Sequence, residues 1–399
     1  MERPYDIVLY GATGFSGGLT ADRLAANAPA DTRWALAGRD RTRLEAVRGR
    51  LAGINPACAD LDLLIADSAD PDSMRSVAES ARVVAAAAGP YAAVGEPMVA
   101  ACARAGTDYI DLTGESVFVD QMYARYHEEA LRTGARLVHA CGFDSVPHDL
   151  GAYFTVHHLP EDVPITIEGF VRMSMTPSGG TWHSLIGMVA DQGAAARAAK
   201  ERAAKERHLS RADGGGTGRR ARIDQRPVPR TRLTKGWALP MPTLDPQIIR
   251  RSAAALDRYG PDFRYGQYMV TRRLVGAAGT AAGAGGLVVA AKIPRIRDYL
   301  LGKRQQGEGP SEDERATGSF LLRFLGEGGG RRVVTEVAGG DPYDATAVIF
   351  SQAALCMAHD DLPATAGQVT PAIAMGDALT ARLRNQGIAF RLLKEEGSA

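Results

Sequence analysis

The chain has 399 residues, and its 47 lysines and arginines almost balance its 46 aspartates and glutamates, for a formal net charge of +1. This balance excludes a general electrostatic case for nucleic-acid binding, and an apolar content of 45% excludes a disordered chain. The length favours two domains over one.

An apolar run at residues 7–9 is followed at once by three glycines in the pattern G-x-x-G-x-x-G, and then by a helix-forming stretch. A strand, a glycine turn and a helix in this order predict the opening of a dinucleotide-binding βαβ unit. In such a unit the pyrophosphate of the bound dinucleotide lies at the helix N-terminus. The alternative is a glycine turn that only joins a strand to a helix. The residues predicted to contact a dinucleotide here are Gly11, Thr13, Gly14, Phe15, Ser16 and Gly17.

The second predicted strand, residues 34–37, is followed by Gly38 and Arg39, about twenty residues beyond the glycines. An NAD site usually carries an acidic residue at this point, whereas the planar guanidinium of Arg39 suits a 2′-phosphate. We therefore predict NADP(H) as the cofactor. Asp40 is expected to cap the next helix. The alternative for Arg39 is a solvated surface side chain.

Strands and helices continue to alternate up to about residue 150, which predicts an α/β fold with a doubly wound parallel sheet, the Rossmann arrangement. The third strand ends at Asp67, which we expect either to lie beside the adenine of the cofactor or to be a simple turn residue. The fourth ends at Gly89, Pro90 and Tyr91. Ligands bind at this carboxyl edge in open α/β sheets, so Asp67, Gly89 and Pro90 join the predicted cofactor site.

The alternation changes beyond residue 150, and we expect an α+β domain with a mixed sheet over residues 151–370, which supplies a substrate floor and a candidate dimer surface. Its clearest elements are a strand at 163–173, one helix at 181–206 and a hairpin at 319–339. Residues 371–399 predict a C-terminal helix and strand.

Two stretches of the second half are unusual in composition. Residues 208–235 are basic and rich in glycine and proline, which predicts a flexible surface loop. Residues 274–291 carry no charge but consist largely of alanine and glycine, which drive membrane insertion weakly. We interpret them as a buried segment of a cytoplasmic protein, with peripheral contact to the plasma membrane as the alternative.

The four cysteines, at positions 58, 102, 141 and 356, have no paired spacing, so they are interpreted as free thiols in a reducing compartment. No apolar leader precedes the first strand, which favours the cytoplasm. No metal-binding motif is visible, and no metal site is predicted.

Several long motifs resemble the saccharopine dehydrogenase-like oxidoreductases, namely GATGFSGGLTADRLA, AAGPYAAVGEPMVAACARAGTDYIDLTGE and GFDSVPHDLG. The C-terminal motifs GEGPSEDERATGSF, VTEVAGGDPYDATA and VTPAIAMGDAL are similar to the actinobacterial trans-acting enoyl reductase branch. The resemblance covers nearly the whole chain outside the basic loop. It implies NADPH-dependent reduction of a carbon–carbon double bond in an acyl or polyketide intermediate held on a carrier protein, in lipid or glycolipid biosynthesis.

Such a reduction needs a donor for the developing enolate oxygen and a proton for the α-carbon. The candidates are Tyr91, as a phenol donor or a packing aromatic, and Asp144 and His148 in the loop after the sixth strand. His148 can donate a proton near neutrality, and Asp144 can instead cap the helix that follows. Asp111 and Glu115 are expected to act in the site or to cap turns.

Two other classes of function stay open. One is a reductase of an imine or carbonyl, which needs arginines gathered around a substrate carboxylate, and Arg172 is one candidate. The other is a non-catalytic, NADPH-binding protein associated with membranes.

Overall fold

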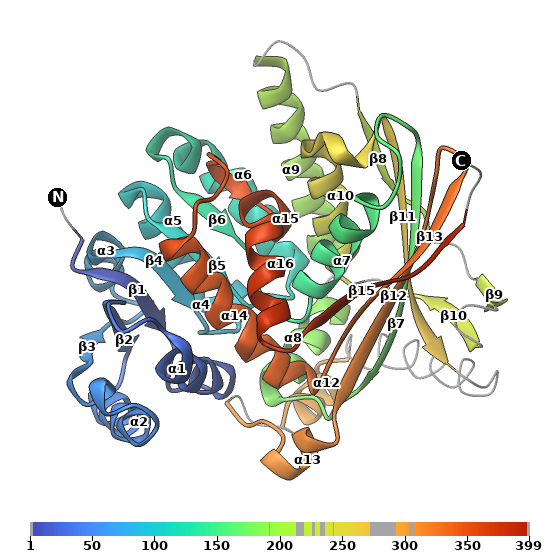
Figure 1. Cartoon of the computed structure of the whole chain (residues 1–399). Coiled ribbons are helices and arrows are strands. Elements are labelled where there is room, and N and C mark those ends of the chain that lie inside the picture. The colour runs from blue at the N-terminus through green and yellow to red at the C-terminus, as the bar shows by residue number, and fades with distance from the viewer. Residues whose placement is uncertain are drawn as a thin grey trace. The chain divides into compact units, whose positions relative to one another are not determined.

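The computed structural model describes residues 3–190, 192–212, 219–225, 228–231, 236–241, 243–271, 293–302 and 307–396 (Figure 1). The chain forms two compact units. Unit 1 contains residues 1–143, 306–309 and 343–386, and unit 2 contains residues 144–305, 310–342 and 387–399. The units divide the chain differently from the three ranges expected from the sequence, since residues 343–386 return to unit 1.

Unit 1 is built on a seven-stranded sheet in the order β14-β6-β5-β4-β1-β2-β3, and every described pairing in it is parallel. The doubly wound Rossmann sheet predicted from the sequence is confirmed. Because the strand order reverses between β1 and β4, the carboxyl ends of these two strands form the switch point where such sheets bind ligands. The strands are β1 (Tyr5–Tyr10), β2 (Trp34–Gly38), β3 (Asp62–Ile65), β4 (Ala81–Ala86), β5 (Asp108–Asp111), β6 (Arg136–Val138) and β14 (Gly367–Val369).

The helices of unit 1 begin and end at residues suited to these positions. Asp40 accepts a hydrogen bond from the Arg43 amide and caps α2, as expected, while Gly106 and Gly134 adopt left-handed conformations that end α5 and α6. The helices are α1 (Phe15–Asn27), α2 (Arg41–Ile54), α3 (Pro71–Ser80), α4 (Tyr91–Val94), α5 (Glu96–Ala105), α6 (Ser116–Thr133), α14 (Pro342–His359), α15 (Pro371–Ala374) and α16 (Gly376–Asn385), with a 3₁₀ turn at Pro56–Asp60.

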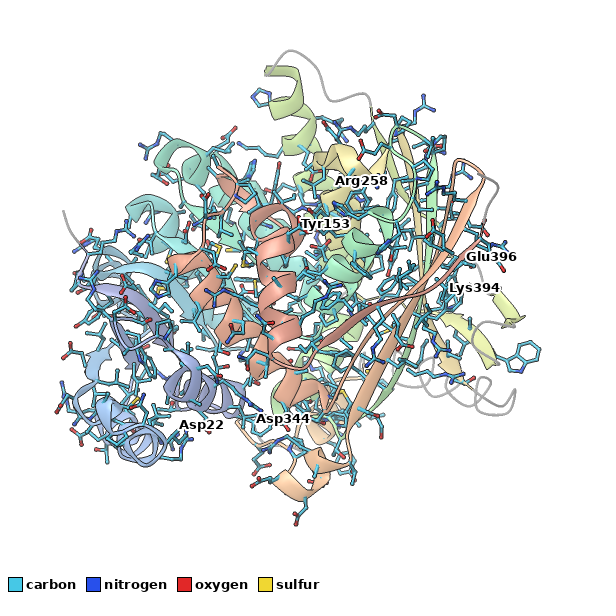
Figure 2. All side chains as sticks on the ribbon, viewed as in Figure 1. Asp22, Tyr153, Arg258, Asp344, Lys394 and Glu396 are labelled. Atoms are coloured by element: carbon cyan, nitrogen blue, oxygen red, sulfur yellow. The ribbon has the colours of Figure 1, made fainter. Side chains whose placement is uncertain are left out.

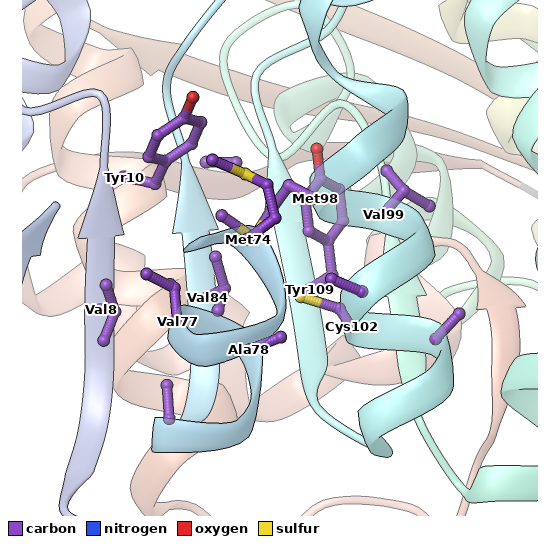
Figure 3. Packing of buried hydrophobic residues seen from close by; sticks show 14 of the residues in the cluster. Val8, Tyr10, Met74, Val77, Ala78, Val84, Met98, Val99, Cys102 and Tyr109 are labelled. Carbon is purple, nitrogen blue, oxygen red and sulfur yellow. The ribbon is translucent and has the colours of Figure 1, made fainter. Parts of the chain in front are cut away.

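One face of this sheet is covered by α3, α5 and α6, whose apolar side chains interdigitate with alternate strand residues (Figure 3). Burial of each large side chain there contributes about 1.5–3 kcal/mol. This layer holds the strands so that their carboxyl ends form one edge. Its buried members include Val8, Tyr10, Met74, Val77, Val84, Met98, Cys102, Tyr109 and Phe118.

Two features near the C-terminus differ from expectation. The helix predicted from residue 371 onward is divided into α15 and α16, because Met375 leaves helical geometry and Gly376 takes a φ of +25°. The strand β14 is not predicted at all. It is three residues long, too short for a periodic signal, and Gln368 is anchored by His127 and by the Val119 carbonyl.

Unit 2 contains a mixed sheet in the order β15-β13-β12-β7-β11-β10-β9, with β8 also paired to β11. The pairs β7–β11 and β8–β11 are parallel and the others antiparallel, which confirms the mixed sheet and the predicted hairpin. The strands are β7 (Ile165–Ser174), β8 (Arg220–Ile223), β9 (Val228–Thr231), β10 (Gly236–Pro240), β11 (Asp262–Thr271), β12 (Ser319–Gly328), β13 (Arg331–Gly339) and β15 (Ala389–Glu396).

Helix α7 packs on the β12–β13 hairpin, where a Cβ on Gly151 would lie 2.4 Å from the Phe324 ring and the Thr155 and Thr335 hydroxyls are 2.6 Å apart. The helical stretch expected at 181–206 forms two helices, α8 and α9. The helices of unit 2 are α7 (Val146–Val156), α8 (Gly179–Ala190), α9 (Gln192–Ala212), α10 (Asp245–Ala255), α12 (Pro294–Leu301) and α13 (Glu312–Ala316), with a 3₁₀ turn at Asp257–Tyr259.

The basic stretch 208–235 is not wholly a loop, and the prediction was wrong where α9 extends to Ala212 and where β8 and β9 form. Pairing with β11 and β10 supplies backbone hydrogen bonds that outweigh the local glycine and proline content. The apolar segment 274–291 lies outside the described residues. Within the described parts, no helix is both long and apolar enough to cross a membrane.

Strand β15 lies at one end of this sheet, and half of its side chains are charged, including Lys394 and Glu396 (Figure 2). Arg331 of the neighbouring strand pairs with Glu395 at 3.3 Å. Charges on a terminal strand discourage further strands from pairing with it.

Candidate functional site

The glycine turn after β1 has the geometry that a dinucleotide needs. Gly11 has a φ of +89°, and a Cβ there would lie 2.8 Å from the Ala88 nitrogen. A Cβ on Gly17 would lie 2.2 Å from the Gly11 carbonyl oxygen, so only glycine lets α1 approach the turn so closely. Both positions therefore require glycine for the backbone to follow this path.

The N-terminus of α1 is open for an anion. Its N-cap, Gly14, has no side chain to occupy the first amides, and a Cβ there would meet only the Gly11 oxygen at 3.5 Å. Thr13 is exposed and Ser16 half-buried beside it. Free amides at a helix N-terminus, with nearby hydroxyls, form a site for phosphate groups.

Phe15, also predicted to contact the cofactor, packs edge-on against Tyr343, with ring centroids 5.4 Å apart. Gly309 approaches the same ring so closely that a Cβ would lie 2.3 Å from it. The Phe15 ring therefore anchors the start of α1 within unit 1, and its contact with the cofactor stays a prediction.

A pocket of about 390 Å³ lies beside this turn and is lined by Thr13, Arg39, Asp40, Arg43 and Asp67. The exposed Arg39 follows β2, and Arg43 is held 3.7 Å from Asp40. Two guanidinium groups beside a helix N-terminus fit the 2′-phosphate and pyrophosphate of NADP(H). Sequence reasoning missed Arg43, although its place one turn into α2 could have revealed it.

Tyr10 lies at the end of β1, and the charges of Asp67 and Arg39 in this pocket both affect the pKa of its phenol. Burial raises the pKa of its phenol, the Asp67 carboxylate raises it further, and the Arg39 guanidinium lowers it. Asp67 also accepts a hydrogen bond from the Ala69 amide at 3.0 Å. Asp67 thus lines the pocket and caps a turn, which is one of the two roles expected of it; its place beside the adenine stays a prediction.

Tyr91 follows Gly89 and Pro90, which are joined by a cis peptide bond, at the carboxyl end of β4. Its buried phenol donates to the Ala86 carbonyl at 2.9 Å and accepts from the Leu112 amide at 3.1 Å. These bonds tie the phenol to the backbone at the carboxyl ends of β4 and β5, and the roles of Tyr91 toward the cofactor and the substrate stay predictions.

Asp111 and Glu115 hold backbone at the same edge of the sheet. Asp111 contacts the His139 ring at 2.6 Å and accepts from the Ala140 amide at 2.9 Å, while Glu115 accepts from the amides of Tyr91 and Ala92. Both residues therefore accept hydrogen bonds from backbone amides, which is the capping role expected of them as one alternative. His139 was not singled out from the sequence.

A second polar group lies inside unit 2, where Asp245 begins α10 and is 2% exposed. Its Oδ1 accepts from the Ser145 hydroxyl at 3.2 Å, and its Oδ2 accepts from the Gln267 amide at 2.7 Å and from the Thr243 hydroxyl. His148 Nδ1 lies 3.9 Å from the same carboxylate. No sequence pattern pointed to Asp245, which lies 100 residues beyond Ser145.

The two predicted proton donors adjoin this cluster. His148 is buried in the first turn of α7, whereas Asp144 is exposed one residue before the Ser145 N-cap. The protein around the Asp144 carboxyl group removes part of its hydration and, together with the negative charge of Asp245, raises its pKa, although the residue keeps contact with solvent. Ser145, and not Asp144, is the N-cap of α7, and it makes no side-chain capping hydrogen bond.

All four cysteines are buried and none is in a disulfide, in agreement with their interpretation as thiols. Among the residues that the structure describes, no histidine, cysteine and carboxylate side chains form a group able to hold a metal ion.

Comparison with known proteins identifies relatives along the whole chain. Residues 7–138 match the family model described as the saccharopine dehydrogenase NADP-binding domain. A trans-acting enoyl reductase of Mycobacterium ulcerans is 36% identical, with 97% of each chain covered, and one of Mycobacterium tuberculosis is 35% identical with the same coverage. Apo saccharopine dehydrogenase (L-Glu forming) from Saccharomyces cerevisiae has a similar fold, with a TM-score of 0.58 over 98% of this chain and 99% of that one at 14% identity.

Proposed function

The chain belongs to the trans-acting enoyl reductase family, and from this premise we propose that it reduces the carbon–carbon double bond of an enoyl thioester with NADPH. The observation that carries the proposal is the cradle of unit 1, where two arginines and an open helix N-terminus fit a phosphorylated dinucleotide. When bound, the cofactor supplies the hydride.

We propose that the glycine turn orients the pyrophosphate and that Arg39 and Arg43 hold the 2′-phosphate. Asp67 also lines the pocket. Gly89 and Pro90 follow the end of β4, which borders the switch point of the sheet, and we propose that they lie near the nicotinamide half of the dinucleotide.

We propose Asp144 or His148 as the source of the proton for the α-carbon. Asp144 follows the end of β6 by six residues, so the chain tethers it within about 20 Å of the carboxyl edge of the Rossmann sheet. The two phenol bonds of Tyr91 support a positioning role for that side chain.

The names of the relatives support a substrate attached to a synthase, since a trans-acting enzyme works on an intermediate held by another protein. We therefore propose an acyl or polyketide thioester on a carrier protein, in lipid or glycolipid assembly. Peripheral membrane contact and a homodimer remain proposals from the sequence.

The alternative, reduction of an imine or carbonyl, needs arginines that hold a substrate carboxylate. Arg172 and Arg323 do line one cavity, but its volume of about 10 Å³ admits only about one water molecule. Arg323 is moreover bonded to Glu336 at 3.1 Å. This cluster gives the alternative no substrate site.

The test follows NADPH absorbance with three acceptors: a trans-2-enoyl thioester on pantetheine, the same enoyl group on an acyl carrier protein, and a keto acid with an amine. We expect oxidation with the enoyl substrates alone. Oxidation only with the keto acid and amine would favour imine reduction. NADPH binding without oxidation of any acceptor would favour the non-catalytic alternative.

A further inference from the structure

We propose that Asp111 is a positioning residue for cofactor binding, which fixes residues 139–141 after β6 in the shape that receives the nicotinamide half of NADPH. This role rests on the proposed function and deepens it, because it adds a determinant of nicotinamide binding to the phosphate contacts. Asp111 and residues 139–141 all belong to unit 1.

Asp111 ends β5, in the half of the Rossmann sheet that does not carry the arginine pocket. Arg39 and Asp67 of that pocket follow β2 and β3, and the proposed function assigns the 2′-phosphoadenosine to them. A doubly wound sheet consists of two mononucleotide-binding halves that meet at the switch point, and the second half here is β4, β5 and β6. The carboxyl ends of β5 and β6 therefore border the place of the nicotinamide nucleotide.

The buried Asp111 joins the ends of these two strands. Its Oδ1 accepts hydrogen bonds from the Ala140 amide at 2.9 Å and from the Thr113 amide at 3.0 Å. Its Oδ2 lies 2.6 Å from Nδ1 of the buried His139 ring. The Asp111 carbonyl oxygen accepts from the Cys141 amide at 2.6 Å. Each of the residues 139–141 is thus bound to Asp111, by its side chain or by its amide.

The segment held in this way contains two features that cost free energy. Ala140 has a φ of +59°, a left-handed conformation that residues with a Cβ rarely adopt. His139 lies edge-on to the rings of Tyr109 and Phe118, with centroids 5.7 and 5.5 Å away. Within the described part of the chain, the buried Nε2 of His139 has no hydrogen-bond partner.

These two features favour a functional reason for this path of the chain. Backbone strain persists only where the surroundings impose it, and it gathers at ligand-binding sites. A buried polar atom without a partner likewise weakens the folded state unless it serves another purpose. Both features lie at the edge of the sheet where this fold binds ligands, and Asp111 contacts both residues that carry them.

Other contacts within unit 1 hold the residues that follow. The Phe143 amide donates to the Thr346 hydroxyl of α14 at 3.1 Å. A Cβ on Gly142 would lie 3.0 Å from the Leu112 side chain and 3.1 Å from that of Thr346. Loss of the Asp111 carboxylate should therefore release residues 139–141 without releasing the rest of the loop.

The same two strands supply a matched control at their opposite ends. Asp108 begins β5 and accepts from the amide of Arg136, which begins β6, at 2.9 Å. The carboxylate of Asp108 also forms an ion pair with the Arg136 guanidinium. Ligands bind at the carboxyl ends of strands in this fold, whereas Asp108 lies at the amino end. An Asp108 variant therefore loses a comparable link between β5 and β6 away from the cofactor.

The experiment measures by titration calorimetry how tightly each variant binds NADPH and 2′-phospho-ADP-ribose, a fragment of the cofactor that lacks the nicotinamide. Asp111→Ala should bind NADPH about tenfold more weakly than the wild type and the fragment within about twofold, because only the nicotinamide meets residues 139–141. Asp108→Ala should change both affinities by one common factor. A loss of stability alone would also change both together.

Two further variants test whether the shape of the segment is the cause. Asp111→Asn keeps an oxygen that can accept from the Ala140 and Thr113 amides, so its NADPH affinity should stay within about threefold of the wild type. Glycine adopts the left-handed conformation without strain, so Ala140→Gly added to Asp111→Ala should recover about threefold of the lost NADPH affinity.

Equal losses of affinity for NADPH and for the fragment in Asp111→Ala, or an unchanged NADPH affinity, would overturn the positioning role. If Asp111→Ala does not fold, His139→Phe replaces it, since a phenyl ring keeps the edge-on packing and loses only the bond to Asp111. This variant should weaken NADPH about threefold and leave the fragment unaffected. The same affinity for NADPH as in the wild type would then contradict the role.

The failure of the proposed function has a different signature. A wild type that binds neither NADPH nor the fragment, or that binds both and reduces no enoyl thioester, would overturn the proposed function. A wild type that reduces the thioester, together with equal losses for both ligands in Asp111→Ala, would overturn the positioning role alone.

Discussion

At the scale of single residues, we propose that two guanidinium groups decide the choice between NADPH and NADH. Arg39 follows β2 and Arg43 lies one turn into α2, and both line the same pocket. Asp40 caps the helix and pairs with Arg43, so it acts on the protein rather than on a ribose hydroxyl. An aspartate in this place therefore does not argue for NAD.

We predict that Arg39→Ala weakens NADPH binding about 10- to 100-fold, because a charge-assisted bond to the 2′-phosphate is lost, and leaves NADH binding within about twofold. Arg43→Ala should show the same selectivity with a smaller loss. Titration calorimetry with both dinucleotides measures it. Arg41→Ala, an exposed neighbour that does not line the pocket, is the control. Equal losses for NADPH and NADH would mean that Arg39 does not touch the phosphate.

At the scale of elements, α1 can pack closely on the glycine turn because Gly11 and Gly17 have no side chains. We predict that Gly17→Ala lowers the free energy of unfolding by about 1–3 kcal/mol and weakens the binding of both NADPH and NADH, because the added methyl group meets the Gly11 oxygen. Gly49→Ala, where a Cβ meets nothing within 4 Å, should not destabilise the protein. Chemical denaturation of the two variants gives the comparison. A Gly17→Ala variant as stable as Gly49→Ala would refute this account of the turn.

Helices α14 and α16 are joined by an ion pair in which Arg382 reaches both oxygens of Asp360, at 2.6 and 2.5 Å. The hydrogen bond from Arg382 lowers the pKa of Asp360, despite its partial burial. A lowered pKa in the folded state gives stability that is present above the unfolded value of 3.8 and is lost as the pH falls below it.

We therefore predict that Arg382→Gln loses about 1–2 kcal/mol at pH 7 and that its stability approaches that of the wild type as the pH falls below 3.8. Thermal unfolding across this range measures the difference. The exposed Arg384→Gln on the same helix serves as the comparison. A deficit of constant size at every pH would show that the charge of Asp360 is not involved.

At the scale of the whole molecule, the features that could be predicted from the sequence are those that depend on residues close together in the chain. The glycine turn, Arg39 and the alternation of strands and helices identified the Rossmann sheet, because each depends on residues close in sequence. Asp245 was missed, since its contact with Ser145 spans 100 residues, and β14 was missed because its contact with His127 spans 241. The motif resemblance identified the family before any contact could be seen.

Contacts between residues that are distant in the sequence also decide the roles of the predicted site residues. The hydrogen bonds of Tyr91 and the contrast between Asp144 and Asp245 depend on neighbours from other elements. Residue type alone therefore left each of these side chains with two interpretations. Only the folded chain shows which polar groups are already occupied and which one faces solvent.

An enoyl reductase transfers hydride from NADPH to the enoyl thioester, and this transfer can be followed atom by atom. The measurement supplies NADPH deuterated at the transferable position of the nicotinamide C4 and analyses the thioester by mass spectrometry and NMR. We expect a saturated thioester with one deuterium on its β-carbon, in amounts equal to the NADPH consumed. A thioester recovered with its double bond intact, while the protein binds NADPH tightly, would contradict it.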